Sequence, residues 1–169
     1  MKKNHVSHKE AYEKRKITKT KELKNWSDYD QKDYKFIVNE YSDEDKKYWN
    51  LCELIVYKGD EVLTTLRTNY SHVNIYYVEY KGKDYLFTNE DYQGFTILNL
   101  TDNTKFGYVP ALARMGAGWC TTYFHDFDED DCELTVDGCV WGAEETRRVY
   151  NLKDLENPDF EDYEQYDLD

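Results

Sequence analysis

The sequence predicts a mainly β protein with two antiparallel, blade-like meanders in an open or partial-propeller arrangement and an N-terminal helical arm. Short runs of alternating apolar and polar residues, rich in β-branched and aromatic types, indicate half-buried strands. Tight glycine turns such as Lys81–Gly82 indicate hairpins between these runs. The 17 tyrosines among 169 residues supply large side chains for a core.

The N-terminal segment, residues 1–35, is expected to be a basic helical or flexible arm. Ser7 followed by Glu10 matches a helix capping box, and the chain from Ala11 to Leu23 has no Gly or Pro. Residues 1–24 contain nine Lys or Arg and three Glu, a net charge of +6, which leaves −19 for the remainder. The apolar residues form no continuous stripe, so the arm either neutralises the acidic body or contacts nucleic acid or an acidic partner.

The β-rich body is expected to span residues 36–157, with repeat units at about 51–106 and 119–155. A short helix is expected at 43–50, where Ser42 can cap it. Alternation predicts strands at 52–57, 61–67, 73–80, 84–88, 95–100, 121–127, 132–136 and 147–152, with a further short segment at 140–142. A short helix begun by Pro110 and ended by Gly116 is expected to connect the two units.

The two units also align with each other, because Leu134 follows Leu86, and Gly142 follows Gly94, by 48 residues. Repeats of this length are typical of propeller blades. The segments 84–96, 116–120 and 137–141 resemble uncharacterised bacterial proteins with WD40-like repeats, over about residues 73–155. The resemblance implies blade-like sheets and supplies no activity. Two blades cannot close a ring, so we expect exposed edges that the arms or a second subunit cover.

The cysteines and the hydropathy predict neither a metal site nor a membrane segment. Cys120, His125, Cys132 and Cys139 are the one cluster with zinc-ligand types, but the expected strands place alternate residues on opposite faces. Core thiols in a reducing cytoplasm are therefore favoured over zinc ligands, and no cofactor is expected. No apolar run approaches the ~18 residues of a membrane span, and no secretory signal is visible.

One acidic segment, Glu90–Asp91–Tyr92, lies where a strand is expected to break before Gly94. Its paired carboxylates fit either acid–base catalysis or a turn or bulge with Gly94 at positive φ, and the turn is favoured.

A second acidic segment consists of Asp126, Asp128, Glu129, Asp130 and Asp131. Its alternating carboxylates resemble a cation loop but lack the glycine of an EF-hand. A solvated hairpin tip is therefore favoured over weak Ca²⁺ or Mg²⁺ binding.

The last segment, residues 158–169, is acidic and aromatic and contains no Lys or Arg. It fits either a disordered solubilising tail or a docking segment in which Glu161, Asp162 and Tyr163 meet a basic surface. A spacing of three residues would place Phe160, Tyr163 and Tyr166 on one face of a helix.

No residue pattern amounts to a catalytic constellation, so we expect a non-enzymatic protein. Its acidic surface repels nucleic acid, but carboxylates along a sheet can substitute for a phosphate backbone. The first hypothesis is an inhibitor or immunity-type protein whose acidic, Tyr-rich face binds the basic cleft of a partner, such as a nucleic-acid enzyme, as phage anti-CRISPR and anti-restriction DNA mimics do. The expected partner-binding residues are Glu90, Asp91, Tyr92, Asp126, Asp128, Glu129, Asp130, Asp131, Glu161, Asp162 and Tyr163.

Two further hypotheses belong to other functional classes. One is a housekeeping β-scaffold or oligomerisation protein, for example a homodimer. The other is a hydrolase or sugar-binding protein that uses Glu90, Asp91 and Trp141.

Overall fold

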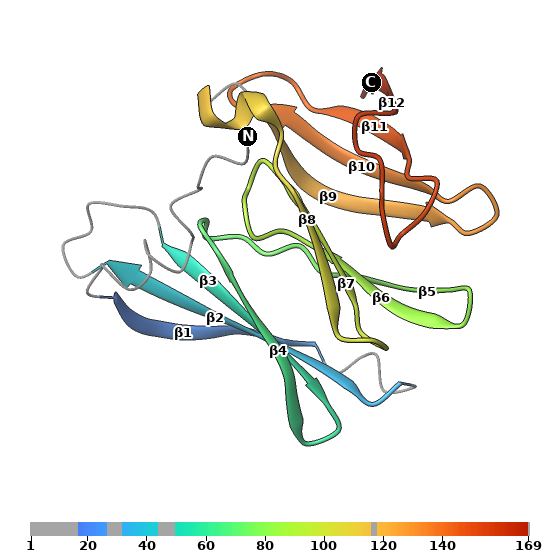
Figure 1. Ribbon diagram of the computed structural model, residues 1–169. Helices are drawn as coiled ribbons and strands as arrows, with labels where there is room; N and C mark the ends of the chain where they lie inside the picture. The colour runs from blue at the N-terminus through green and yellow to red at the C-terminus, as the bar shows by residue number, and fades with distance from the viewer. Residues whose placement is uncertain (1–16, 27–31, 44–49, 116–117, 169) are drawn as a thin grey trace. The chain divides into compact units, whose positions relative to one another are not determined.

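The computed structural model describes residues 17–26, 32–43, 50–115 and 118–168, which form three four-stranded antiparallel sheets (Figure 1). Strands that follow one another in the sequence are neighbours in each sheet, so each sheet is an up-and-down meander. The chain divides into two compact units, residues 1–73 and 74–169. The predicted mainly β class is confirmed, and the described residues contain three meanders where the sequence predicts two.

The described residues of the first unit form one sheet, from β1 (Ile17–Trp26), β2 (Tyr34–Asp43), β3 (Leu51–Lys58) and β4 (Glu61–Thr68). Strands β2 and β3 pair without interruption, and alternate pairs share one face of the sheet. On one face, Phe36 lies opposite Val56 and Val38 lies opposite Leu54. All four of these side chains are buried, as expected for one apolar face of an antiparallel pair.

The predicted N-terminal helix is wrong for residues 17–23, which belong to β1. This strand pairs with β2 from Ile17 opposite Asp43 to Trp26 opposite Phe36. Pairing with a neighbouring strand overrides helix propensity here, because a polar helix with no packed face has little stability of its own. The first part of the predicted helix, and residues 44–49 of the helix expected at 43–50, lie outside the described residues.

The second unit contains two sheets. One consists of β5 (Tyr76–Tyr80), β6 (Lys83–Thr88), β7 (Phe95–Asn99) and β8 (Thr104–Tyr108). The other consists of β9 (Trp119–Asp128), β10 (Glu133–Val140), β11 (Thr146–Asn151) and β12 (Tyr163–Asp167), and the 3₁₀ helix η1 (Ala111–Met115) precedes it. The predicted unit 51–106 thus contains strands from two sheets. β8 and β12 complete the two meanders.

Tight turns fix the strand order of these meanders. Lys81 and Gly82 both have positive φ, at 49° and 73°, which is the geometry that suits a two-residue hairpin between β5 and β6. Gly94 does not have the predicted positive φ. Glycine is needed there because a Cβ atom would lie 2.4 Å from the carbonyl oxygen of Tyr108.

The core of the second unit lies between its two sheets and is largely aromatic. Phe87 on β6 contacts Phe127 on β9, with ring centroids 5.5 Å apart. Phe95 on β7 contacts Tyr150 on β11 at 5.1 Å, edge to face. Each large ring removes substantial apolar area from water, and the tilted geometries are those that aromatic pairs prefer.

The connection between β11 and β12 is anchored in this core by Phe160, which is only 2% exposed. Its ring stacks on that of Phe95 at 4.5 Å and on that of Tyr108 at 5.2 Å. The backbone nitrogen of Asn151 donates to the carbonyl oxygen of Asp162, which starts the pairing of β12. Residues 158–168 are therefore neither a disordered tail nor a helix.

Replacing Phe160 with Ala is expected to lower the free energy of unfolding by about 3–5 kcal/mol, because the cavity would open between stacked rings. Tyr123→Ala is the control, since Tyr123 is 59% exposed, and its effect should stay within about 0.5 kcal/mol. Urea unfolding followed by circular dichroism measures both. Equal effects of the two substitutions would contradict the anchoring role of Phe160.

Candidate functional site

Two acidic segments that are separate in the sequence lie side by side at one end of the β9–β12 sheet. Glu133 on β10 is the register partner of both Asp128 on β9 and Asn151 on β11. The nitrogen of Leu152 then donates to the carbonyl oxygen of Cys132 at 3.1 Å. The β9–β10 turn therefore adjoins the β11–β12 connection. We call these carboxylates the acidic end: Asp126, Asp128, Glu129, Asp130, Asp131, Asp159, Glu161 and Asp162.

The β9–β10 turn holds its carboxylates in the solvent. The Asp128 carboxylate accepts hydrogen bonds from the backbone nitrogens of Asp130 at 2.9 Å and Asp131 at 3.3 Å. This side-chain cap fixes the turn, as Asp commonly does. Glu129, Asp130 and Asp131 are exposed, which confirms the predicted hairpin tip.

The β11–β12 connection adds further carboxylates, and Lys153 partly neutralises their charge. Lys153 Nζ lies 2.9 Å from Asp159 Oδ2 and 3.1 Å from Asp162 Oδ2. The hydrogen bond from Lys153, followed by that from the backbone of Glu161, holds the pKa of Asp159 below its usual range. One lysine serves two carboxylates here, so the acidic end keeps an excess of negative charge.

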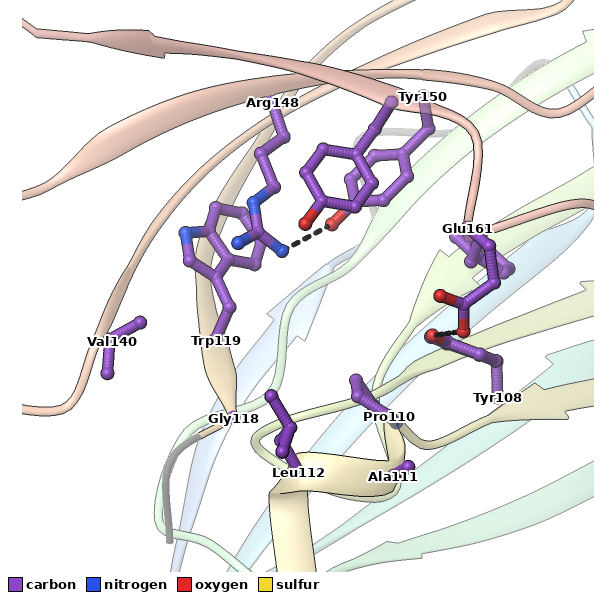
Figure 2. A pocket seen from close by; sticks show the side chains of 12 residues that line it. Tyr108, Pro110, Ala111, Leu112, Gly118, Trp119, Val140, Arg148, Tyr150 and Glu161 are labelled. Atoms are coloured by element: carbon purple, nitrogen blue, oxygen red, sulfur yellow. Dashed lines mark hydrogen bonds between the residues drawn. The ribbon is translucent and has the colours of Figure 1, made fainter.

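Glu161 and Tyr163 also line a pocket of about 300 Å³ within the second unit (Figure 2). This volume is at the lower end of the range for small-ligand pockets. Figure 2 shows η1 with Ala111 and Leu112 on one side of the pocket, and Trp119 with Arg148 on another. The pocket thus joins apolar and aromatic walls to the edge of the acidic end.

Arg148 is the central polar group of this pocket. Its Cζ atom lies 4.5 Å from the ring centroid of Trp119 and 4.3 Å from that of Tyr163. Its Nε donates to Gln165 Oε1 at 2.9 Å, and its Nη1 donates to the hydroxyl of Tyr150 at 3.4 Å. Cross-strand register explains the grouping, because Gln165 lies opposite Arg148 and Tyr163 opposite Tyr150.

Arg148 also differs from its neighbour Arg147 in the way its charge is stabilised. Arg147 forms two hydrogen bonds with the Asp137 carboxylate, at 2.7 and 2.9 Å. Within the described part of the chain, no carboxylate lies within ion-pair distance of Arg148. The faces of the two aromatic rings take that role, since a guanidinium stacks favourably on them.

The hydroxyls of Tyr108 and Tyr150 in the pocket remain protonated at neutral pH. Burial raises the pKa of Tyr150 to about 12, against the opposing effect of the hydrogen bond from Arg148. Burial, and then the hydrogen bond that Tyr108 donates to Glu161, raises the pKa of Tyr108. Both hydroxyls are hydrogen-bond donors and poor bases. The pocket is therefore suited to binding a ligand or a partner side chain.

The predicted residues Glu90, Asp91 and Tyr92 lie in the β6–β7 connection, away from the acidic end. Glu90 accepts two hydrogen bonds from Lys105 Nζ, at 3.0 and 2.8 Å. The buried Asp91 carboxylate accepts from the backbone nitrogen of Gln93, which confirms the predicted turn. Tyr92 contacts Trp141, which follows β10 at the end opposite Asp128. The predicted partner-binding set therefore splits into two groups.

The cluster Cys120, His125, Cys132 and Cys139 is also divided. Cys120 and Cys139 are register partners near one end of the β9–β10 hairpin, whereas Cys132 follows the turn at the other end. Among the residues that the structure describes, no group of three or more His, Cys, Asp or Glu side chains is placed to hold a metal ion.

Sequence reasoning missed the pocket residues Trp119, Arg148 and Tyr150. Alternation within the strand expected at 147–152 places Arg148 and Tyr150 on one face, which is the signal that was present. The partners across the pocket come from η1 and from the β11–β12 connection, which the sequence does not align with that strand.

Comparison with protein-family models, with curated proteins and with solved structures finds no match for this chain. The resemblance to proteins with WD40-like repeats therefore stays a prediction. The fold and the site define an antiparallel β protein with an acidic end and an adjoining aromatic pocket. No helix in the described ranges has the length and apolar character required to cross a membrane.

Replacing Arg148 with Ala is expected to lower the free energy of unfolding by about 1–2 kcal/mol, because two cation–π contacts of a half-buried guanidinium are lost. Trp119 should also become more accessible to acrylamide quenching of its fluorescence, and a Trp119→Phe background should remove that change.

The adjacent substitution, Arg147→Ala, is the matched control. It removes the partly buried, bidentate ion pair with Asp137 on the other face of the sheet and should leave Trp119 shielded. Equal quenching in the two variants would show that Arg148 does not cover the Trp119 ring.

Proposed function

We propose that this protein is a non-enzymatic interaction module of inhibitor or immunity type, whose acidic end binds a basic cleft of a partner protein. The observation that carries the proposal is the pairing of the β9–β10 turn with the β11–β12 connection. This pairing concentrates exposed carboxylates from both segments, with Lys153 as a counter-charge for two of them.

A basic cleft is the surface that such a cluster fits best. Complementary charges accelerate association and exclude partners of like charge. Clefts that bind nucleic acid are basic, so a nucleic-acid enzyme is the proposed class of partner and DNA mimicry the proposed mode. The acidic carboxylates are carried on strand ends and a capped turn, so little conformational entropy is lost when they bind.

The adjoining pocket supports the same proposal. Trp119 and Leu112 provide apolar wall area, while Glu161 belongs to both the pocket and the acidic end. Binding energy at interfaces is concentrated where an anchor side chain fills a desolvated pocket. We propose that an apolar side chain of the partner enters here, after the acidic end has attracted the basic surface.

A second candidate function, oligomerisation, is favoured by the edge strand β12. All five residues of this strand are exposed, and an open edge can pair with another strand. However, β12 carries Glu164 and Asp167, and like charges brought together across two edges are unfavourable. A partner with basic residues suits this edge better than a second copy does.

The test measures binding to the partner captured from native cells, at low and high ionic strength. The double variant Glu129→Gln/Asp130→Asn should weaken the affinity about tenfold, mostly through a slower association rate. Raising the salt from about 50 to about 500 mM should weaken wild-type binding as well. Biolayer interferometry with the purified partner gives both rate constants.

The matched control is Glu144→Gln/Glu145→Gln, which removes the same charge at the β10–β11 turn, the opposite end of the same sheet. It should bind almost as the wild type does. Binding that does not depend on salt, or an equal loss of affinity in the two double variants, would contradict the electrostatic proposal. If sedimentation velocity showed a stable dimer, and this dimer did not bind basic partners, the scaffold function would be favoured instead.

A further inference from the structure

Cys120 and Cys139 lie directly opposite each other on adjacent antiparallel strands. They are register partners in the β9–β10 pair, flanked by Trp119 opposite Val140 and Thr121 opposite Gly138. Side chains of directly opposed residues point to the same face of a sheet. The Cα atoms of such pairs are about 4.5–5.5 Å apart, within the ~4.4–6.8 Å that a disulfide bond requires.

The electrostatics of the two thiols agree with this proximity. Both cysteines are free thiols in the structure, with Cys120 buried and Cys139 half-buried. Burial raises the pKa of Cys120 to about 11, and the neighbouring Cys139 and Asp91 add to this rise. Burial, followed by the effect of Glu145, raises the pKa of Cys139 as well. Cys139 is thus the more accessible of the two thiols.

The remaining cysteine of the second unit, Cys132, is not placed for pairing with either of them. Cys132 lies in the β9–β10 turn, at the other end of the hairpin, next to Glu133; Cys139 follows Glu133 by six positions along β10, about 20 Å. Cys52 belongs to β3 in the other compact unit. Within the second unit, the geometry therefore singles out one pair.

We propose that Cys120 and Cys139 form a reversible intramolecular disulfide when the protein meets a low-molecular-weight disulfide such as oxidised glutathione. The Cys139 thiolate attacks one sulfur of oxidised glutathione, which forms a mixed disulfide and releases one reduced glutathione. The Cys120 thiolate then attacks Sγ of Cys139 and releases the second. The two protein thiols lose two protons and two electrons, and the oxidant takes up both to become two thiols.

The disulfide would fasten the β9–β10 hairpin at the end that carries the pocket residues Trp119 and Val140. A link between paired strands restricts the unfolded chain and opposes fraying at this end. Oxidation is therefore expected to raise the thermal unfolding temperature. This inference is independent of the acidic end and of any partner.

The test treats the full-length protein with oxidised glutathione at about pH 8.5, where more thiolate is present, and maps disulfides by mass spectrometry. Trypsin is unsuitable, because no Lys or Arg occurs between positions 115 and 146. A protease that cuts before aspartate separates the cysteines instead, into fragments 45–59, 102–125, 131–136 and 137–153. We expect fragment 102–125 linked to fragment 137–153, with the link removed by dithiothreitol.

Cys132→Ser is the matched control and should keep both the link and the rise in unfolding temperature on oxidation. Cys139→Ser should lose both, while its reduced form unfolds like the reduced wild type. Glutathione attached to Cys139 beside a free Cys120, a link that includes Cys132, or no oxidation at all would each overturn the proposal.

Discussion

The stack of Phe160 on Phe95 is the interaction on which the candidate site depends. It draws the β11–β12 connection onto the core between the two sheets of the second unit. The connection returns along this path from Leu152 to Tyr163, where β12 begins to pair with β11. Without the anchor, neither the wall of the pocket formed by Glu161 and Tyr163 nor the second half of the acidic end would be held in place.

Local patterns in the sequence predict a large part of this fold. Strands such as β6, β7 and β10 alternate or bury a continuous apolar run, and the Lys81–Gly82 turn requires positive φ at both positions. These signals are local, so the sequence contains them in full. The exposed β9–β10 hairpin tip is predictable for the same reason, because residues 128–131 are all acidic and none of them is apolar.

Features that depend on a distant partner were not predictable in the same way. β12 has five exposed residues, and only its register against β11 makes it a strand. β1 likewise gains its structure by pairing with β2. The pocket joins side chains from η1, β9, β11 and the β11–β12 connection, and no spacing within the chain encodes that meeting. Tertiary contacts decided each of these cases.

Gly138 lies beside both the Trp119 wall of the pocket and Cys120 in the β9–β10 hairpin. A Cβ atom there would lie 2.2 Å from the carbonyl oxygen of Cys120 and 2.6 Å from the ring of Trp119. The absence of a side chain therefore lets the Trp119 ring lie against β10, where it can receive the guanidinium of Arg148. The next residue along β10, Cys139, is the register partner of Cys120. Gly138 thus lets the aromatic wall of the pocket pack on one face of the hairpin, beside the pair of thiols.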